Sequence, residues 1–149
     1  MRSEPQPRPA RWAADAPLGA ARPDRMRVLL IEDDPLVRAS LSDALGLAAL
    51  EVDGLSNAED ALILLGAGQV PDVLVADVDL GEGLSGFDLA DIARDRHPDV
   101  EVILISGTAP DPWPARQHER FLRKPFAPDD LVQAIRDAAG PREADPARV

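Results

Sequence analysis

The sequence predicts an α/β fold, a doubly wound parallel sheet with helices on both faces. Two observations carry this prediction. Short, continuously apolar runs alternate along the chain with segments of helical periodicity, and such runs are typical of strands buried on both faces. Each run also ends in polar side chains, which a parallel sheet collects at its carboxyl edge, where ligands bind. We expect right-handed connections throughout.

Nine elements follow from this pattern. They are strand 27–31, helix 35–49, strand 51–55, helix 58–66, strand 72–77, helix 86–96, strand 101–105, strand 120–123 and helix 128–139. Pro35 and Pro128 suit first helical turns, and Asn57 is a good N-cap. His97-Pro98 closes the helix near 86–96.

Apolar spacing predicts which faces of the first and last helices are buried. The first helix is expected to bury one face made of Leu36, Val37, Leu41 and Leu45. The last helix is expected to bury Leu131, Val132 and Ile135.

Composition limits the organisation and the function classes. The 149 residues suit one domain, expected over 26–139. Residues 1–25, rich in Pro, Ala and Arg, are expected to be a disordered extension, and 140–149 a flexible tail. The extension is either a tether or a stretch preceding the true initiator, Met26.

Net charge and residue composition limit the classes of binding partner and the cellular compartment that we expect. The net charge of −11 argues against a nucleic-acid ligand. There is no Cys, no apolar stretch long enough for a membrane span and no secretion signal. We therefore expect a cytoplasmic protein that does not bind membranes.

Polar residues that follow four of the strands provide the candidate site. These residues are Glu32-Asp33-Asp34, Asp77 with Asp79, Ser106-Gly107 and Lys124-Pro125. Five carboxylates side by side would repel one another, and a dication that prefers oxygen ligands removes the repulsion. Mg²⁺ suits such a set better than Ca²⁺, because no calcium-binding loop is present.

The same residues suit phosphoryl transfer. Asp77 is the candidate nucleophile, forming an acyl phosphate. Lys124 and Ser106 are candidates to stabilise the charge that builds on the phosphoryl oxygens.

Together these motifs resemble the signature of response-regulator receiver domains, of the stand-alone, chemotaxis-regulator-like kind. The resemblance covers Met26 to Ala139 and rests on Ile31-Glu32-Asp33-Asp34-Pro35, Val75-Ala76-Asp77-Val78-Asp79, Ile105-Ser106-Gly107 and Lys124-Pro125-Phe126. It implies a flavodoxin-like sheet of strand order 2-1-3-4-5.

The resemblance also implies roles for individual residues. Asp77 would accept a phosphoryl group from a histidine kinase or phosphotransferase. Glu32 and Asp33 would be the acidic pair that holds Mg²⁺, together with Asp77 and the backbone carbonyl of Asp79. Ser106 would be the switch residue and Lys124 the site lysine, with a cis bond before Pro125. The protein would signal by protein contact, as a monomer or weak homodimer, and would not be a turnover enzyme.

Two departures from the family pattern stand out. The loop after Asp79 is glycine-rich, with Gly81 and Gly83. Only residues 107–119, which include three prolines, separate Ser106 from the last strand, so the fourth helix of the family is expected to be reduced or absent.

Two other readings remain open at this stage. One is a binding module on a receiver scaffold that works without phosphorylation, which the shortened fourth helix favours. The other is a phosphatase of the haloacid-dehalogenase type, suggested by Asp77-Val78-Asp79, although the order of motifs and the missing cap domain argue against it.

Overall fold

The computed structural model describes residues 25–107 and 119–140. Its elements are β1 (Arg27–Ile31), α2 (Pro35–Leu47), β2 (Glu51–Leu55), α3 (Ala58–Gly66), β3 (Val73–Asp77), α4 (Gly86–Arg96), β4 (Glu101–Ser106), β5 (Glu119–Arg123) and α5 (Pro128–Ala139). The strands form one parallel sheet in the order β2-β1-β3-β4-β5. The α/β class, the parallel sheet and its strand order are thus confirmed.

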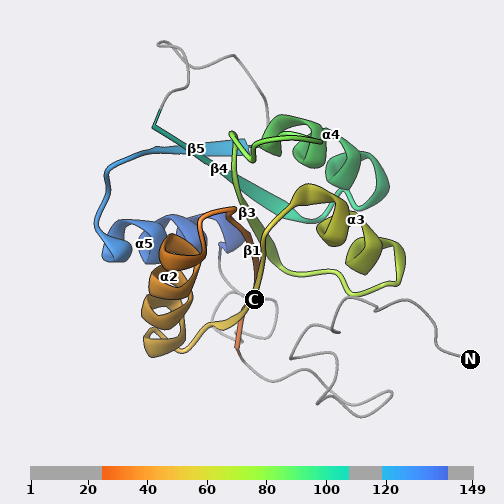
Figure 1. Ribbon diagram of the computed structural model, residues 1–149. Helices are drawn as coiled ribbons and strands as arrows, with labels where there is room; N and C mark the ends of the chain where they lie inside the picture. Colours follow the sequence, from red (N-terminus) through yellow and green to blue (C-terminus); the bar gives the residue numbers. More distant parts are fainter. Residues whose placement is uncertain (1–24, 108–118, 141–149) are drawn as a thin grey trace, which may run out of the picture.

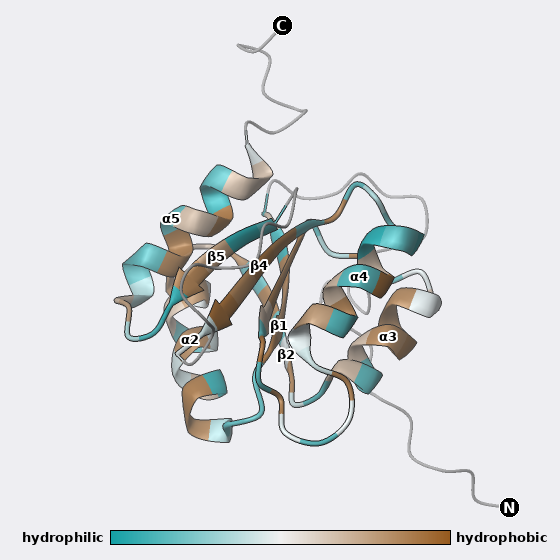
Figure 2. Cartoon of the chain, turned by 90° about the horizontal axis from the view of Figure 1, so that it is seen from above, coloured by the Kyte–Doolittle hydropathy of each residue, from teal (hydrophilic) through white to brown (hydrophobic). Residues whose placement is uncertain are grey.

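Helices cover both faces of this sheet (Figure 1). Seen along the sheet, α2 and α5 lie on one side and α3 and α4 on the other, with the apolar strands between them (Figure 2). Because successive strand residues point to opposite faces, Leu29 and Ile31 join the core under α3 and α4, whereas Val28 and Leu30 join the core under α2 and α5.

Three of the helices have a side-chain cap at their N-terminus. Asp34 caps α2, its Oδ1 accepting the N–H groups of Leu36 at 2.9 Å and Val37 at 3.3 Å. Asn57 caps α3 as predicted, accepting the N–H of Asp60 at 2.8 Å. Ser85 caps α4 in a reciprocal capping box with Asp88. These caps place the helix starts beside the carboxyl ends of the strands.

The predicted buried face of α2 was partly wrong. Leu41 and Leu45 are buried and Val37 packs against the core, but Leu36 is 80% exposed. At about 100° per residue, Leu36 lies half a turn away from Leu45, so the two cannot share a face. In α5, by contrast, Leu131 and Ile135 are fully buried and Val132 packs partly against the core.

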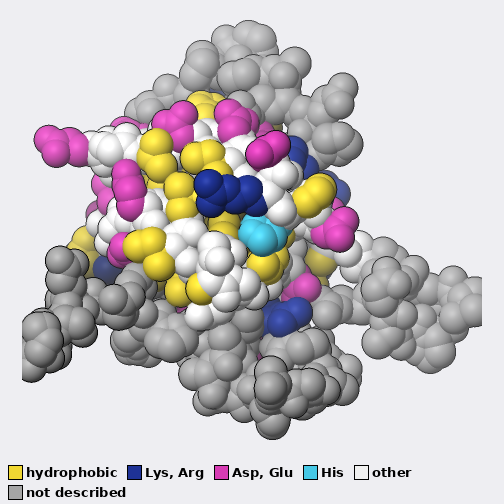
Figure 3. All heavy atoms as spheres, turned by 90° about the vertical axis from the view of Figure 1, so that its right-hand side faces the viewer, with side chains coloured by type: hydrophobic (Ala, Val, Ile, Leu, Met, Phe, Trp, Pro, Cys, Tyr) yellow, Lys and Arg dark blue, Asp and Glu magenta, His cyan; other side chains and the backbone are white. Residues whose placement is uncertain are grey.

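The outer surface of α3 and α4 is mixed. Acidic side chains border a group of hydrophobic ones on this side (Figure 3), and Ile63 of α3 is half-exposed. In the described part of the chain, every helix is too short or too polar to cross a bilayer.

Several sequence predictions lie outside the described residues. Of the expected extension 1–25 only Arg25 is described, and of the expected tail 140–149 only Gly140. The segment 107–119 is described only at its two ends, so the reduced fourth helix stays a prediction.

Candidate functional site

The candidate residues meet at the carboxyl edge of the sheet. Asp77 is the last residue of β3 and Ser106 the last of β4, while Glu32 follows β1 and Lys124 follows β5. Asp77 pairs with Ile105 and Ser106 with Arg123. This register brings side chains from four parallel strands to one place, as the sequence predicted.

Three of these residues are buried although they are polar. The exposed fraction is 2% for Glu32, 5% for Asp77 and 1% for Ser106. Among the described residues, these three make up the buried polar and charged set of the protein. A buried carboxylate costs free energy unless a counter-charge or hydrogen bond compensates it, so their clustering calls for a partner charge.

Lys124 supplies part of that charge. Its Nζ donates to Oδ2 of Asp77 at 2.6 Å and to Oε1 of Glu32 at 3.4 Å. The Lys124 backbone N–H donates to the carbonyl of Ser106 at 3.0 Å. The bond between Lys124 and Pro125 is cis, as the resemblance implied. A single ammonium thus lies between two buried carboxylates.

The pKa values of Glu32 and Lys124 reflect this excess of negative charge. Burial, reinforced by the neighbouring charge of Asp77, raises the pKa of Glu32 from 4.5 to about 7, against the lowering effects of the Asp34 N–H hydrogen bond and of Lys124. Burial alone would lower the pKa of Lys124, but its hydrogen bond to Asp77 and the charges of Asp77 and Glu32 outweigh burial and raise it. The site is therefore short of positive charge.

Three carboxylates are placed to share a cation. Glu32, Asp33 and Asp77 each offer an oxygen, and these oxygens lie within 4.8 Å of one another. Asp33 is exposed and the other two are buried, so the cluster opens to solvent on one side. An all-carboxylate set that is short of positive charge fits Mg²⁺, which binds a few protein oxygens and keeps other positions for water and phosphate.

The other two acids play different parts. Asp34 does not join the cluster through its own carboxylate, which caps α2, although its N–H donates to Oε2 of Glu32 at 3.1 Å. The expected convergence of five carboxylates was therefore too broad. Asp79 is exposed, and its N–H donates to Oδ1 of Asp77 at 2.9 Å. The Asp79 backbone thus contacts the site, while its side chain faces solvent.

Two residues that support the site carried no functional signal in the sequence. Arg38 of α2 donates from Nη1 to the carbonyl of Glu32 at 2.7 Å, which holds the backbone of this acid. Gly86, the first residue of α4, packs directly on the backbone of β3, because a Cβ there would lie 2.9 Å from the carbonyl carbon of Asp77. Only tertiary contacts reveal either role.

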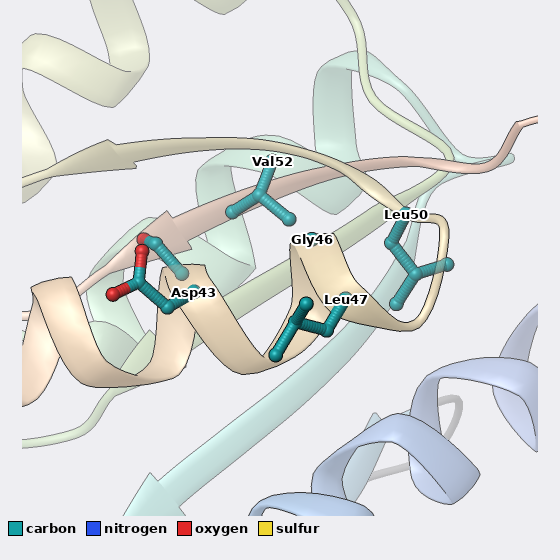
Figure 4. A pocket seen from close by; sticks show the side chains of 6 residues that line it. Asp43, Gly46, Leu47, Leu50 and Val52 are labelled. Carbon is teal, nitrogen blue, oxygen red and sulfur yellow. The ribbon is translucent and has the colours of Figure 1, made fainter.

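A hollow elsewhere on the molecule contains none of the site residues. It has a volume of about 450 Å³ and lies between the end of α2 and the start of β2 (Figure 4). Its lining is Ser42, Asp43, Gly46, Leu47, Leu50 and Val52. Since β2 begins there, the hollow is at the amino edge of the sheet, opposite the carboxylate cluster.

Comparison with known proteins agrees with this geometry. The family model of the response regulator receiver domain matches residues 28–136. This chain belongs to the response regulator receiver family. The receiver fold is also found in a solved response regulator receiver protein from Sinorhizobium medicae, with a TM-score of 0.72, 24% identity, and coverage of 78% of this chain and 95% of that one.

Several curated proteins contain similar receiver sequences. The C4-dicarboxylate transport transcriptional regulatory protein DctD of Pseudomonas aeruginosa is 34% identical over 116 residues, which are 75% of this chain and 25% of DctD. Response regulator GacA of the same species is 28% identical over 127 residues, 81% of this chain and 59% of GacA. The receiver thus spans less than two thirds of these relatives.

A hybrid kinase also contains a related domain. The sensor kinase CckA of Brucella abortus is 33% identical over 115 residues, 74% of this chain and 12% of that protein. The solved receiver domain of a hybrid histidine kinase CckA has a TM-score of 0.66 and 27% identity, with 76% of this chain and 99% of that domain covered. Receivers of this kind are signalling modules rather than turnover enzymes.

Proposed function

We propose that this receiver takes a phosphoryl group on Asp77 and returns it to water or to a partner, and that the phosphorylated form signals by protein contact. The observation that carries the proposal is the ion pair of 2.6 Å between Lys124 and the buried Asp77, beside carboxylates placed to share a cation. Folding does not require buried carboxylates at these positions, because apolar side chains of similar size would pack there at a lower cost in free energy.

The residues suit the chemistry step by step. An oxygen of Asp77 attacks phosphorus, the bond from phosphorus to the donor breaks, and its electron pair leaves with the donor. Negative charge then lies on the phosphoryl oxygens, within reach of the ammonium that already contacts Asp77. The Ser106 hydroxyl, at the end of the neighbouring strand, is the proposed donor to one of these oxygens.

Mg²⁺ is the proposed cofactor. Glu32, Asp33 and Asp77 would hold it through carboxylate oxygens, and the backbone carbonyl of Asp79 is the proposed fourth protein ligand. When bound, the ion neutralises charge on the carboxylates and on the phosphoryl group.

The donor is proposed to be a phosphohistidine on a histidine kinase or phosphotransferase. Support comes from the relatives, which include response regulators and the receiver of a hybrid histidine kinase. The acidic, open side of the cluster suits a donor that brings its own positive charge to the site.

Intact-mass spectrometry after incubation with Mg²⁺ and acetyl phosphate tests the proposal. Wild type is expected to gain the mass of one phosphoryl group, and Asp77→Asn to gain none. Asp43→Asn, which removes an exposed acid at the amino edge, is the matched control and is expected to behave like wild type.

Two results would contradict the proposal. An adduct of equal yield on Asp77→Asn would place the phosphoryl group elsewhere. No adduct on wild type, either from acetyl phosphate or from phosphohistidine donors, would favour a binding module that works without phosphorylation.

A further inference from the structure

The loop that follows Asp77 is fixed to the core by Leu80, whose side chain is buried under α3 and α4, but its glycine-rich part lies beyond that anchor. This β3–α4 loop comprises residues 78–85, and its ends are joined by a hydrogen bond of 3.0 Å from the Gly86 N–H to the carbonyl of Val78. Gly81 and Gly83 have φ angles of 78° and 90°. Glycines adopt such angles easily but lose much conformational freedom when they are fixed, so a contact beyond Leu80 would help to hold this part of the loop.

Glu59, from the first turn of α3, makes that contact. Its Oε2 accepts the N–H of Leu84 at 3.0 Å, across 25 positions of sequence. The Gly81 and Ser85 N–H groups, in contrast, donate to side chains only two and three positions away. A Cβ at position 83 would lie 2.5 Å from the same Oε2, so the carboxylate rests directly on the glycine.

The backbone segment that leads to Glu59 is hydrogen-bonded to the backbone of Glu32 in the site. The carbonyl of Leu55, at the end of β2, accepts the N–H of Glu32 at 3.0 Å. Asn57 caps α3 and Ala58 is fully buried, so the short segment from Leu55 to Glu59 is fixed at both ends. Glu59 therefore connects the loop after Asp77 with the backbone of Glu32.

The near end of the loop contacts the candidate phosphoacceptor. The Asp79 N–H donates to Oδ1 of Asp77, and Asp79 Oδ1 accepts the N–H of Gly81. Hydrogen bonds thus follow the loop from Asp77 through Asp79 to Gly81, and the Glu59 contact begins three residues further on.

We propose that Glu59 is a positioning residue for the phosphorylation site. By holding Leu84, it fixes the β3–α4 loop so that the Asp79 N–H stays on Asp77 and orients the Asp77 carboxylate. Glu59 acts through the loop backbone and does not touch a reacting group. Its effect on phosphorylation rests on the proposed function, whereas its coupling to Asp79 does not.

Amide hydrogen exchange and Mg²⁺ titration of the full chain test the proposal in three variants. Glu59→Ala removes the acceptor, Glu59→Gln keeps a carbonyl oxygen at the same place, and Glu82→Ala removes a neighbouring exposed acid of the same loop. In Glu59→Ala, exchange at both Leu84 and Asp79 is expected to be faster, and the Mg²⁺ dissociation constant larger, by about three- to tenfold, the loss expected for one hydrogen bond. Glu59→Gln and Glu82→Ala are expected to stay within about twofold of wild type, because both retain an acceptor for the Leu84 N–H.

A fourth variant, Gly83→Ala, disturbs the contact between Glu59 and the loop by a change in the loop itself. The added methyl group displaces the Glu59 carboxylate, and the left-handed backbone is strained as well. Faster exchange at Asp79 is expected here too. The effect should shrink in the Glu59→Ala background, where no carboxylate remains to be displaced.

Three outcomes would overturn the proposal. In the first, Glu59→Ala speeds exchange at Leu84 only, while Asp79 and the Mg²⁺ dissociation constant stay at wild-type values. In the second, Glu59→Gln is as damaging as Glu59→Ala, so that charge rather than the hydrogen bond matters. In the third, Glu82→Ala has the same effect as Glu59→Ala. A wild-type protein that takes no phosphoryl group would defeat the proposed function but leave the exchange test of Glu59 intact.

Discussion

The amino and carboxyl edges of the sheet differ in how their charged side chains are paired. At the amino edge, Arg27 lies 3.6 Å from Asp72 and Arg25 lies 3.9 Å from Glu51, in pairs that are partly open to solvent. At the carboxyl edge, one ammonium faces two buried carboxylates. Each of these amino-edge acids has an arginine of its own, whereas buried charge short of a partner costs free energy and so indicates a ligand. The contrast supports the proposal that the functional site lies at the carboxyl edge of the sheet.

Removing the ammonium should give the largest effect. Lys124→Ala is expected to slow phosphorylation by acetyl phosphate about a hundredfold or more, because a preorganised donor to the developing charge is lost. The measurement is the initial rate of mass gain. Arg27→Ala removes a cation from the amino edge and should leave this rate within about twofold, because Arg27 lies at the opposite edge of the sheet from Asp77. An equal fall in the phosphorylation rate of the two variants would show that the carboxyl edge has no special role in the reaction.

The pH dependence of stability should expose the buried acid. The pKa of Glu32 is about 7 in the folded protein against an ordinary value of 4.5, so the folded state holds this proton more tightly than the unfolded state. The resulting stabilisation is present below pH 4.5 and is lost as the pH rises through about 7. The shift corresponds to about 3 kcal/mol.

Urea unfolding of Mg²⁺-free protein at several pH values measures this loss. Glu32→Gln carries no titrating group at this position, so its free energy of unfolding should fall less over the same range. Parallel curves for the variant and wild type would show that Glu32 is not the group responsible.

Two helical glycines provide a comparison of packing at the two edges. Gly86→Ala should destabilise the protein by about 1–3 kcal/mol, because a methyl group would overlap the backbone of Asp77 and Val78. Gly46→Ala, in α2 beside the amino edge, meets no atom within 4 Å and should stabilise by about 0.5–1 kcal/mol. Denaturant midpoints would measure both. A stable Gly86→Ala variant would mean that α4 can move away from β3.

The last prediction concerns the response of stability to Mg²⁺. At ten times its dissociation constant, Mg²⁺ should add about 1.4 kcal/mol to the free energy of unfolding by binding only the folded state. Asp33→Asn should lose most of this gain, and Asp43→Asn at the amino edge should keep it. Melting temperatures recorded with and without Mg²⁺ make the comparison, and a gain retained by Asp33→Asn would remove this residue from the metal site.

Much of the architecture was predictable because its signals are local. The apolar runs, the N-cap at Asn57 and the prolines in the first turns of α2 and α5 act over a few residues, so they can be read along the chain. The place of the candidate site residues in the fold was predictable for a related reason. Parallel strands bring their carboxyl ends to one edge, so polar residues that end strands must gather there.

Other features depended on distances that the sequence does not contain. Both Asp34 and Asp33 follow the first strand, and only the start of α2 decides that Asp34 caps the helix while Asp33 stays with the carboxylate cluster. The exposure of Leu36 and the close approach of Gly86 to Asp77 depend on where the helices pack against the sheet.

The sequence by itself determined the strands, the polar residues at their carboxyl ends and the chemical groups that these residues carry. Tertiary structure alone decided which groups meet. Lys124 and Asp77 are 47 positions apart, and Glu59 and Leu84 are 25 apart. Such contacts form only when the sheet, its register and its covering helices are all in place, because a hydrogen bond depends on positions within a few tenths of an ångström rather than on the order of residues.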